Sequence, residues 1–501
     1  MKKTWKTGFV LGLASCSLFL ANQVRADDLA VAINQVNLGI KGYEFGPAVK
    51  HLIVSLDTPV DKVSKEQLKV TTAGVEQKVQ SVYLSDAKGN KSKDSSSQFV
   101  TIELPVSFDV KANAGVATPF RYDLTDFHNH WVDDYTVSIA GLGVVSGDAQ
   151  ATLATEENGI ANRVSTQTDA FSNRGSHSGV YLNPMTQQEE EITLQYAAYE
   201  PQKLADGEKN PLIIWLHGQG EGGDDTDITL LGNEVVALAQ KSVQKHFLAG
   251  NQSGAYVLAV QTPTYWMDEG DGTNSGAGDS RYTQALMDTI KDYVDQHTDV
   301  DTSRIYLTGG SNGGYMTINM GVHYPDYFAA LVPQAAAYSY YQYERNDDGT
   351  YKTQPDEKSL SGVSAIRKDD VYFGTDQINA LKNQPMWFIH AKNDTVVNPK
   401  NYALPVYKAL VDNGAKNKWF SYFESVKGSD MKNTNYLGHW SWTYFFNDKV
   451  TGVQNASAIK KAKGLKGFEA SNKTHGGSAS AKVDGETYHN VYDWMNAQVK
   501  K

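Results

Sequence analysis

A serine between glycines is the first feature of this chain that could do chemistry. The stretch YLTGGSNGGYMT, residues 306–317, carries the pattern G-x-S-x-G around Ser311. An apolar run precedes Ser311 and a helical pattern follows it, which predicts a sharp strand-to-helix turn that exposes the hydroxyl as a nucleophile. Gly309 and Gly313 occupy the positions where a side chain would collide with the neighbouring backbone. A glycine-rich turn without chemistry is the alternative.

A serine nucleophile needs a base and an acid that orients this base. Asp394 follows the apolar run PMWFIHAK, and His439 lies in GHWSWTYFFND, just past the run KWFSYFES. Of the 12 histidines, two others follow Asp394, in a low-complexity segment and at the start of the terminal helix: His475 and His489. The order Ser311, Asp394, His439 therefore predicts a triad in which His439 is the base and Asp394 fixes its tautomer. The alternatives are a plain Asn-Asp turn at Asp394, or one of two other acids: Asp412 and Asp430.

The oxyanion donors are expected from a loop that precedes the serine in the chain. The run PLIIWLHGQG predicts a buried strand that ends at residues 217–220. The backbone N–H groups of Gln219 and of Asn312, the residue after the serine, are the predicted donors. His217 lies before the serine, the wrong place for the base, and is interpreted as a packed structural histidine.

Aromatic side chains suggest a substrate cleft. Tyr265, Trp266 and Trp440, with the tyrosine-rich residues 338–352, could bind a sugar or aryl ester, although residues 338–352 could equally be a packed surface loop. The acidic stretches GDDTDIT and MDEGDGTNSGAGD show no ordered ligand spacing, so we interpret them as solvated loops rather than calcium sites. We expect no metal and no organic cofactor.

The elements that must position these residues follow from the hydrophobic pattern. From residue 180 onward, continuous apolar runs such as PLIIWLHG and AYVLAVQTP alternate with helical patterns. In YTQALMDTIKDYVDQH, the apolar residues recur on one helical face: Leu286, Ile290, Tyr293 and Val294. Continuous runs are typical of strands covered on both faces, so the pattern predicts an α/β fold with a mostly parallel sheet and helices on both faces.

The preceding part of the chain has a different pattern. Residues from about 30 to 145 contain short segments that alternate apolar and polar residues, which indicates a small all-β sandwich. We predict a signal peptide at 1–26, a β-sandwich at 27–150, a polar linker at 151–179 and a catalytic domain at 180–501. A Gly/Ser/Lys-rich insertion, residues 464–485, precedes a last amphipathic helix.

Composition limits the partners and the location. The 501 residues carry a formal net charge of -11, which argues against nucleic acid and anionic membranes as main partners. A basic start, a short apolar run and small residues before residue 27 predict a secretory leader and an extracellular protein. The alternative is a lipoprotein leader ending at Cys16, the only cysteine. No later stretch is long and apolar enough to predict a membrane span.

Four segments carry a resemblance to a known family: PLIIWLHGQGEGGD, DTSRIYLTGGSNGGYMT, PMWFIHAKNDTVVNP and GHWSWTYFFND. The chain resembles secreted bacterial α/β-hydrolase esterases of the polyhydroxybutyrate-depolymerase-like and feruloyl-esterase-like group, with an immunoglobulin-like N-terminal domain. The resemblance assigns the nucleophile to Ser311, the acid to Asp394, the base to His439 and the oxyanion donors to Gln219 and Asn312. The insertion at 464–485 departs from the family pattern.

The resemblance implies a serine carboxylesterase that hydrolyses a short-chain or aryl ester through an acyl-enzyme. The substrate would be a small-molecule or glycan-linked ester. Two alternatives stay open: a serine peptidase of the prolyl-oligopeptidase type, and an inactive carbohydrate-binding protein or adhesin. The sequence does not predict the oligomeric state.

Overall fold

The computed structural model describes residues 29–108, 118–123, 125–202, 207–270, 276–356 and 362–500. The predicted signal peptide lies outside the described residues. The chain divides into two compact units. The described residues of the first unit are 29–40, 49–106 and 133–164, and those of the second are 41–48, 107–108, 118–123, 125–132 and the described residues from 165 to 500.

The first unit is built from two sheets. One has the strand order β12 (Asn162–Val164), β1 (Ile33–Tyr43), β2 (Gly46–Val60), β7 (Ser97–Glu103) and β6 (Ser81–Ser85). The other has the order β11 (Ala149–Gly159), β10 (Thr136–Ser146), β4 (Lys69–Thr72) and β5 (Val75–Gln77), with β3 (Lys62–Ser64) paired to β10. Buried and less buried positions alternate along β10, as expected for a strand with one face in a core.

Residues 151–179 were predicted to be a linker, and here the structure differs. They contain most of β11, all of β12 and most of β13 (Asn173–Leu182). Along β13, the edge strand of the second unit's sheet, more exposed and less exposed positions alternate, because successive side chains of a strand point to opposite faces. An edge strand with polar side chains has the composition of a loop, and for this reason the sequence pattern was misleading.

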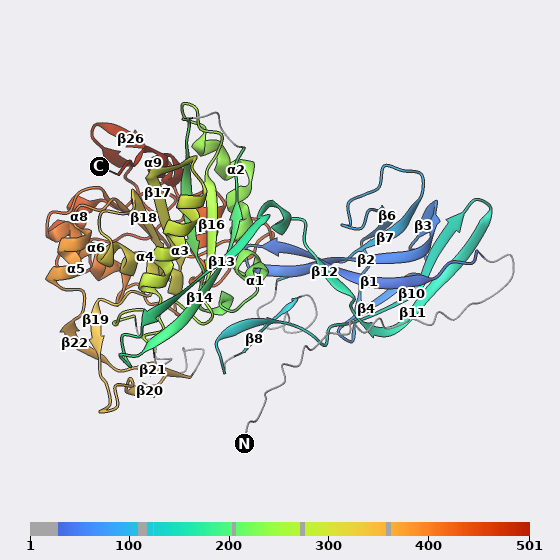
Figure 1. Ribbon diagram of the computed structural model, residues 1–501, viewed down its shortest axis with the longest axis horizontal. Coiled ribbons are helices and arrows are strands. Elements are labelled where there is room, and N and C mark those ends of the chain that lie inside the picture. The colour runs from blue at the N-terminus through green and yellow to red at the C-terminus, as the bar shows by residue number, and fades with distance from the viewer. Residues whose placement is uncertain are drawn as a thin grey trace, which may run out of the picture. The chain divides into compact units, whose positions relative to one another are not determined.

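The second unit contains an eight-stranded sheet (Figure 1). Its order is β13, β14 (Glu189–Tyr199), β16 (Tyr256–Gln261), β15 (Asn210–Leu216), β17 (Val300–Gly310), β18 (Ala330–Gln334), β23 (Met386–Ala391) and β24 (Lys418–Phe423). The pairs from β16 to β24 are parallel, and β13 and β14 are antiparallel. Every residue of β15, β16, β18 and β23 is buried, which explains their continuous apolar runs.

Helices cover both faces of this sheet. Three of them contribute apolar residues to one large core cluster: α3 (Thr283–Gln296), α4 (Asn312–His323) and α6 (Ala403–Asp412). Figure 1 shows α3 and α4 in front of the strands and α9 (Val491–Ala497) behind them. The remaining helices are α1 (Thr226–Gly232), α2 (Lys241–Gln244), α5 (Thr375–Leu381), α7 (Trp442–Phe446) and α8 (Ala456–Lys461). The predicted face of α3 is buried at Leu286, Ile290, Tyr293 and Val294.

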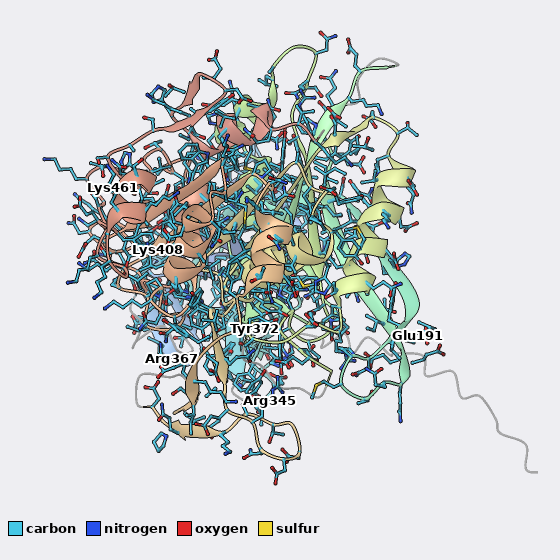
Figure 2. The ribbon with its side chains drawn as sticks, turned by 90° about the vertical axis from the view of Figure 1, so that its left-hand side faces the viewer. Glu191, Arg345, Arg367, Tyr372, Lys408 and Lys461 are labelled. Carbon is cyan, nitrogen blue, oxygen red and sulfur yellow. The ribbon has the colours of Figure 1, made fainter. Side chains whose placement is uncertain are left out.

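Two insertions extend the sheet domain. The first contains β19 (Tyr341–Tyr343) paired with β22 (Arg367–Val371), and β20 (Thr353–Pro355) paired with β21 (Val363–Ala365). Figure 2 shows Arg345, Arg367 and Tyr372 at this insertion, which projects beyond the helices and the sheet. Arg345 anchors it, since its Nη2 lies 2.5 Å from Oε2 of the buried Glu269.

The second insertion is the predicted segment 464–485, with β25 (Ala481–Val483) paired to β26 (Glu486–Tyr488). It packs along β24, the last strand of the sheet. The N–H of Tyr422 donates to Gly476 O (2.8 Å), and the N–H of Ser471 donates to Tyr422 O (2.9 Å). The segment thus supplies hydrogen-bond partners to an otherwise open sheet edge. Within the described residues, no helix has the length and apolar character that a membrane crossing requires.

Candidate active site

Ser311 lies in a strained turn between β17, which ends at Gly310, and α4, which begins at Asn312. Its φ and ψ are 56° and -110°, a conformation that L-residues rarely adopt. A Cβ added at Gly313 would lie 2.0 Å from Leu216 O, and one added at Gly309 would lie 2.6 Å from the Gly313 carbonyl. Gly313 is therefore required for α4 to approach β15 this closely, and Gly309 for the tight turn between β17 and α4; at both positions a side chain would collide with neighbouring backbone, as the sequence predicted.

The backbone holds Ser311 in this conformation through three hydrogen bonds. Its N–H donates to Gln334 O at 2.9 Å, and its carbonyl accepts from Tyr315 N at 2.9 Å and from Ala337 N at 3.1 Å. Strain at a non-glycine residue persists only where the surroundings fix the backbone, and this is such a place.

His439 and Asp394 are in direct contact. Nδ1 of His439 lies 2.8 Å from Oδ2 of Asp394, and both side chains are buried. Oδ1 of Asp394 accepts from Val396 N and Val397 N, each at 2.9 Å. Burial alone would raise the pKa of Asp394, but the charge of His439 and hydrogen bonds from His390 and His439 hold this pKa well below its usual value. Asp394 is therefore ionised, as an acceptor for the Nδ1–H of His439 must be.

The two rival acids lie elsewhere. Asp412 forms an ion pair with Lys408 on α6, with Oδ2 and Nζ 2.9 Å apart. Asp430 accepts hydrogen bonds from Glu44 N at 2.8 Å and from the hydroxyl of Tyr436 at 2.7 Å. Within the part of the chain that the structure describes, the carboxylate that contacts His439 is that of Asp394.

Ser311 and His439 line one cavity of about 490 Å³. The loop after β15 lines it as well, and Gln219 opens a short 3-10 helix there, η2 (Gln219–Glu221). Asn312 is buried at the start of α4, and its Oδ1 accepts from Met267 N at 3.0 Å. The structure thus brings Ser311, Gln219 and His439 to one cavity, with Asp394 behind His439 and Asn312 next to Ser311.

His217 has the surroundings of a structural residue, as predicted. It is fully buried, and its Nδ1 lies 2.6 Å from Gly218 O while its Nε2 accepts from Thr262 N at 3.1 Å. Burial lowers the pKa of His217 to about 3, so the ring is neutral.

The predicted substrate-binding aromatics separate into two groups. Trp440 lines the cavity. Tyr265 and Trp266 do not line it and belong to the hydrophobic core, which corrects the sequence-based expectation. The ring centroid of Trp266 lies 5.2 Å from that of His217 and 6.2 Å from that of Tyr282. A tryptophan in a loop after a strand resembles a cleft residue in sequence, but here it fills space beneath the loop that carries His217.

Two polar residues at the site were not predicted from the sequence. The first is His390, the fifth residue of β23, which is fully buried, with Nε2 3.0 Å from Asp394 Oδ2 and 2.9 Å from Val397 O. Its spacing of four residues from Asp394, across the end of a strand, was the available signal.

The second is Glu221, in the loop after β15. Its Oε1 accepts from Nδ2 of Asn129 at 3.1 Å, and it lines the cavity. Burial raises the pKa of Glu221 to about 7, against the opposing effects of hydrogen bonds from Gly218, Asn233 and Asn129 and of the charge of His439. Glu221 lies in the glycine-rich stretch GQGEGG, and nothing in this sequence pattern indicates that its side chain is buried.

Three family models match parts of the chain. Residues 35–152 match the esterase Ig-like N-terminal domain, residues 194–338 match the esterase PHB depolymerase family, and residues 276–451 match the prolyl oligopeptidase family. A curated relative, poly(3-hydroxyalkanoate) depolymerase C of Paucimonas lemoignei, is 37% identical over 70 residues. This match spans 14% of the present chain and 16% of the depolymerase.

A solved structure supports the fold. The crystal structure of a thermostable esterase superposes with a TM-score of 0.58 at 20% identity, and the match covers 83% of the present chain and 97% of the esterase. At this identity the likeness concerns the fold. The predicted α/β-hydrolase fold with an all-β sandwich before it is confirmed. The matches also support the prediction of a serine hydrolase that acts on esters. The chain therefore resembles, as predicted, the α/β-hydrolase esterases that carry an Ig-like N-terminal domain.

Proposed function

We propose that the protein is a serine carboxylesterase in which Ser311 is the nucleophile, His439 the base and Asp394 the acid. The observation that carries this proposal is the 2.8 Å contact between His439 and the buried Asp394, at a cavity that Ser311 also lines from a strained turn. The ionised Asp394 favours the tautomer of His439 in which Nδ1 carries the proton, so that Nε2 is free to accept one.

In this mechanism Oγ of Ser311 attacks the ester carbonyl carbon while Nε2 of His439 takes its proton. The N–H groups of Gln219 and Asn312 stabilise the negative oxygen of the tetrahedral intermediate. The intermediate collapses as His439 protonates the leaving alcohol. Water then attacks the acyl-enzyme while Nε2 of His439 takes a proton from it. His439 returns this proton to Oγ of Ser311 as the bond to the acyl group breaks, which releases the carboxylic acid and restores Ser311.

The proposed substrate is a short-chain or aryl ester, free or linked to a glycan. We also propose that the protein is secreted by means of the leader at 1–26. The sequence pattern of this leader, with its basic start, short apolar run and small residues before residue 27, supports that location.

The test is hydrolysis of p-nitrophenyl acetate and butyrate, combined with a fluorophosphonate label read by intact mass. We expect the wild type to hydrolyse both esters and to gain one phosphonyl group. Ser311→Ala should lose at least about a thousandfold in kcat/KM and should not be labelled. Ser178→Ala, at an exposed serine of β13, is the matched control and should behave as the wild type. A wild type without esterase activity and without label would favour the inactive carbohydrate-binding alternative.

A peptidase remains the second candidate, because residues 276–451 match the prolyl oligopeptidase family. An amide and an ester with the same acyl group separate the two functions. We expect benzyloxycarbonyl-Gly-Pro-p-nitroanilide to be cleaved at least about a hundredfold more slowly than the corresponding p-nitrophenyl ester, measured as kcat/KM. Equal rates after correction for the spontaneous reactivity of the two substrates would favour the peptidase.

A further inference from the structure

Two short segments from far upstream in the sequence belong to the compact unit that holds the site. They are Lys41–Ala48 and the described residues of 107–132. The cavity that contains Ser311 is lined by nine residues of these segments: Glu44, Phe45, Gly46, Pro47, Phe108, Thr118, Phe120, Tyr122 and Asn129. These segments therefore form one wall of the cavity, and we call them the upstream wall.

Hydrogen bonds fix the upstream wall to the loops around the site. The wall contains a hairpin of β8 (Phe120–Asp123) and β9 (His128–Trp131), and three residues of β9 contact the loops after β15 and β16. Asn129 donates to Glu221 Oε1 at 3.1 Å, Nε1 of Trp131 donates to Asp225 Oδ2 at 2.6 Å, and Nε2 of His128 lies 2.9 Å from Thr264 O. The wall is thus attached to the loop that carries the proposed oxyanion donor Gln219.

The other segment of the wall, Lys41–Ala48, is attached to a segment much later in the chain, which contains Ser429 and Asp430. Glu44 accepts a hydrogen bond from Ser429 N at 2.7 Å, and its own N–H donates to Asp430 Oδ2 at 2.8 Å. Glu44 is buried, and burial raises its pKa. These bonds place Phe45 beside the segment that carries His439.

Aromatic rings dominate this part of the cavity. The ring centroids of Phe45 and Phe108 lie 4.9 Å apart, and those of Phe108 and Trp440 lie 5.8 Å apart. Trp440 follows His439 directly in the chain. The rings of Phe45, Phe108 and Trp440 therefore form a continuous aromatic surface that leads to the proposed catalytic base.

The remaining lining is mostly apolar or uncharged, and its two carboxyl groups belong to the buried residues Glu44 and Glu221. Three of its residues are large hydrophobic side chains with substantial exposure: Tyr122 at 38%, Val396 at 46% and Leu437 at 39%. No lysine or arginine occurs among the described residues that line the cavity. An apolar surface at a cavity mouth is a place where apolar ligands bind, and a cavity without a cation disfavours an anionic group.

We propose that Phe45 and Phe108 of the upstream wall determine specificity, and that they form a subsite for an uncharged, ring-bearing part of the ester. This inference rests on the proposed function, since it concerns the substrate of the same site. A phenyl ring stacked against these side chains gains both apolar burial and favourable ring–ring geometry. A straight short chain leaves most of this surface in water.

Two matched substrate pairs test the proposal with the full chain. Methyl 3-phenylpropionate is compared with methyl butyrate for a ring in the acyl group, and benzyl acetate with ethyl acetate for a ring in the alcohol. Hydrolysis is followed by proton release. We expect a ring preference of about tenfold or more in kcat/KM for at least one pair. A preference below about twofold in both pairs would overturn the proposal.

Variants assign this preference to the wall. Phe45→Ala and Phe108→Ala should each lower the ring preference at least about fivefold. Phe108→Leu, which keeps an apolar side chain, should lower the ring preference as well. This variant replaces Phe108→Ala in the test if the alanine variant does not fold. Phe99→Ala, at a half-buried phenylalanine of β7 outside the cavity, is the control and should keep the wild-type ratio. An unchanged ratio in the Phe45 and Phe108 variants would overturn the proposal.

Charged analogues complete the test. Methyl 3-phenylpropionate with a carboxylate or a trimethylammonium group on the ring should be hydrolysed more slowly than the parent ester. A preference for the ammonium ester would instead indicate recognition of a cation by the carboxylates and rings, and would contradict an uncharged subsite. If no ester is hydrolysed and Ser311 is not labelled, the proposed function fails; if small esters are hydrolysed without ring preference, only the present inference fails.

Discussion

His390 donates a hydrogen bond from Nε2 to Oδ2 of Asp394 at 3.0 Å, the same oxygen that His439 contacts at 2.8 Å. Both histidines and the carboxylate are buried, so water does not compete with these contacts. His390 also lies 2.9 Å from Val397 O, in the loop whose N–H groups bind the other oxygen of Asp394. His390 thus links the end of β23 to the carboxylate that orients the proposed base, and we regard it as a positioning residue.

His390→Phe removes this donor and keeps a flat ring of similar size. We expect kcat/KM for p-nitrophenyl acetate to fall about tenfold or more, because a hydrogen bond to a charged group contributes on the order of 1.5–3 kcal/mol. With one donor fewer, Asp394 should stabilise the protonated form of His439 more strongly, so the acidic limb of the pH profile should move to higher pH. His390→Gln, which can still donate, should recover part of the rate. A lower melting temperature with an unmoved pH profile would show that His390 has a purely structural role.

Asp394→Asn tests the proposed acid. An amide cannot hold the Nδ1–H tautomer of His439 as a carboxylate does, so we expect kcat to fall by roughly a thousandfold or more with a small change in KM. Asp412→Asn is the control, because Asp412 pairs with Lys408 on α6. Comparable losses in the two variants would argue against the assignment of the acid to Asp394.

Features that depend on neighbouring residues in the chain could be predicted from the sequence. The buried strands β15, β16, β18 and β23 appear as continuous apolar runs, because burial on both faces leaves no polar side to the strand. The turn at Ser311 could be predicted because Gly309 and Gly313 lie two positions before and after the serine, between an apolar run and a helical pattern, and a Cβ at Gly309 would meet the Gly313 carbonyl. The contact of His439 with Asp394 followed from their order after Ser311.

Features that depend on distant segments could not be predicted. Phe45 and Phe108 reach the cavity although 266 and 203 positions separate them from Ser311 in the numbering, and no local pattern records this. The sequence around them alternates apolar and polar residues, which indicates strands of a sandwich, and most of residues 30–145 do form such strands. Trp266 was misplaced for a related reason, because aromatic composition does not distinguish a core ring from a cleft ring.

The buried Glu221 makes stability depend on pH. Its pKa in the folded protein is about 7, above the ordinary value of 4.5. The folded state therefore holds a proton that the unfolded state has already released between these pH values, and stability falls as pH rises from about 4.5 to 7. The shift corresponds to an upper limit of about 3 kcal/mol. We expect Glu221→Gln to flatten the decline in the free energy of unfolding, measured in urea at pH 5, 6, 7 and 8.

The exposed Glu486 provides the control for this experiment. Glu486→Gln should leave the pH dependence of the wild type in place, since an exposed carboxyl keeps similar surroundings in both states. If the free energy of unfolding of Glu221→Gln falls with pH in parallel with that of the wild type, the proton is bound elsewhere and the assignment to Glu221 is wrong.

Gly313→Ala tests the close approach beneath Ser311. The added Cβ would lie 2.0 Å from Leu216 O and 2.6 Å from His217 O, and both are backbone atoms of the strand and loop that precede the proposed oxyanion donor. Because backbone atoms cannot move aside as a flexible side chain can, we expect a loss of about 3 kcal/mol or more in the free energy of unfolding. Gly374→Ala is the control, since its nearest neighbour, Gln377 Oε1, would lie 3.8 Å from the new Cβ. A loss below about 1 kcal/mol for Gly313→Ala, or one no larger than that of Gly374→Ala, would mean that β15 and α4 can separate without cost, and that the turn does not depend on this glycine.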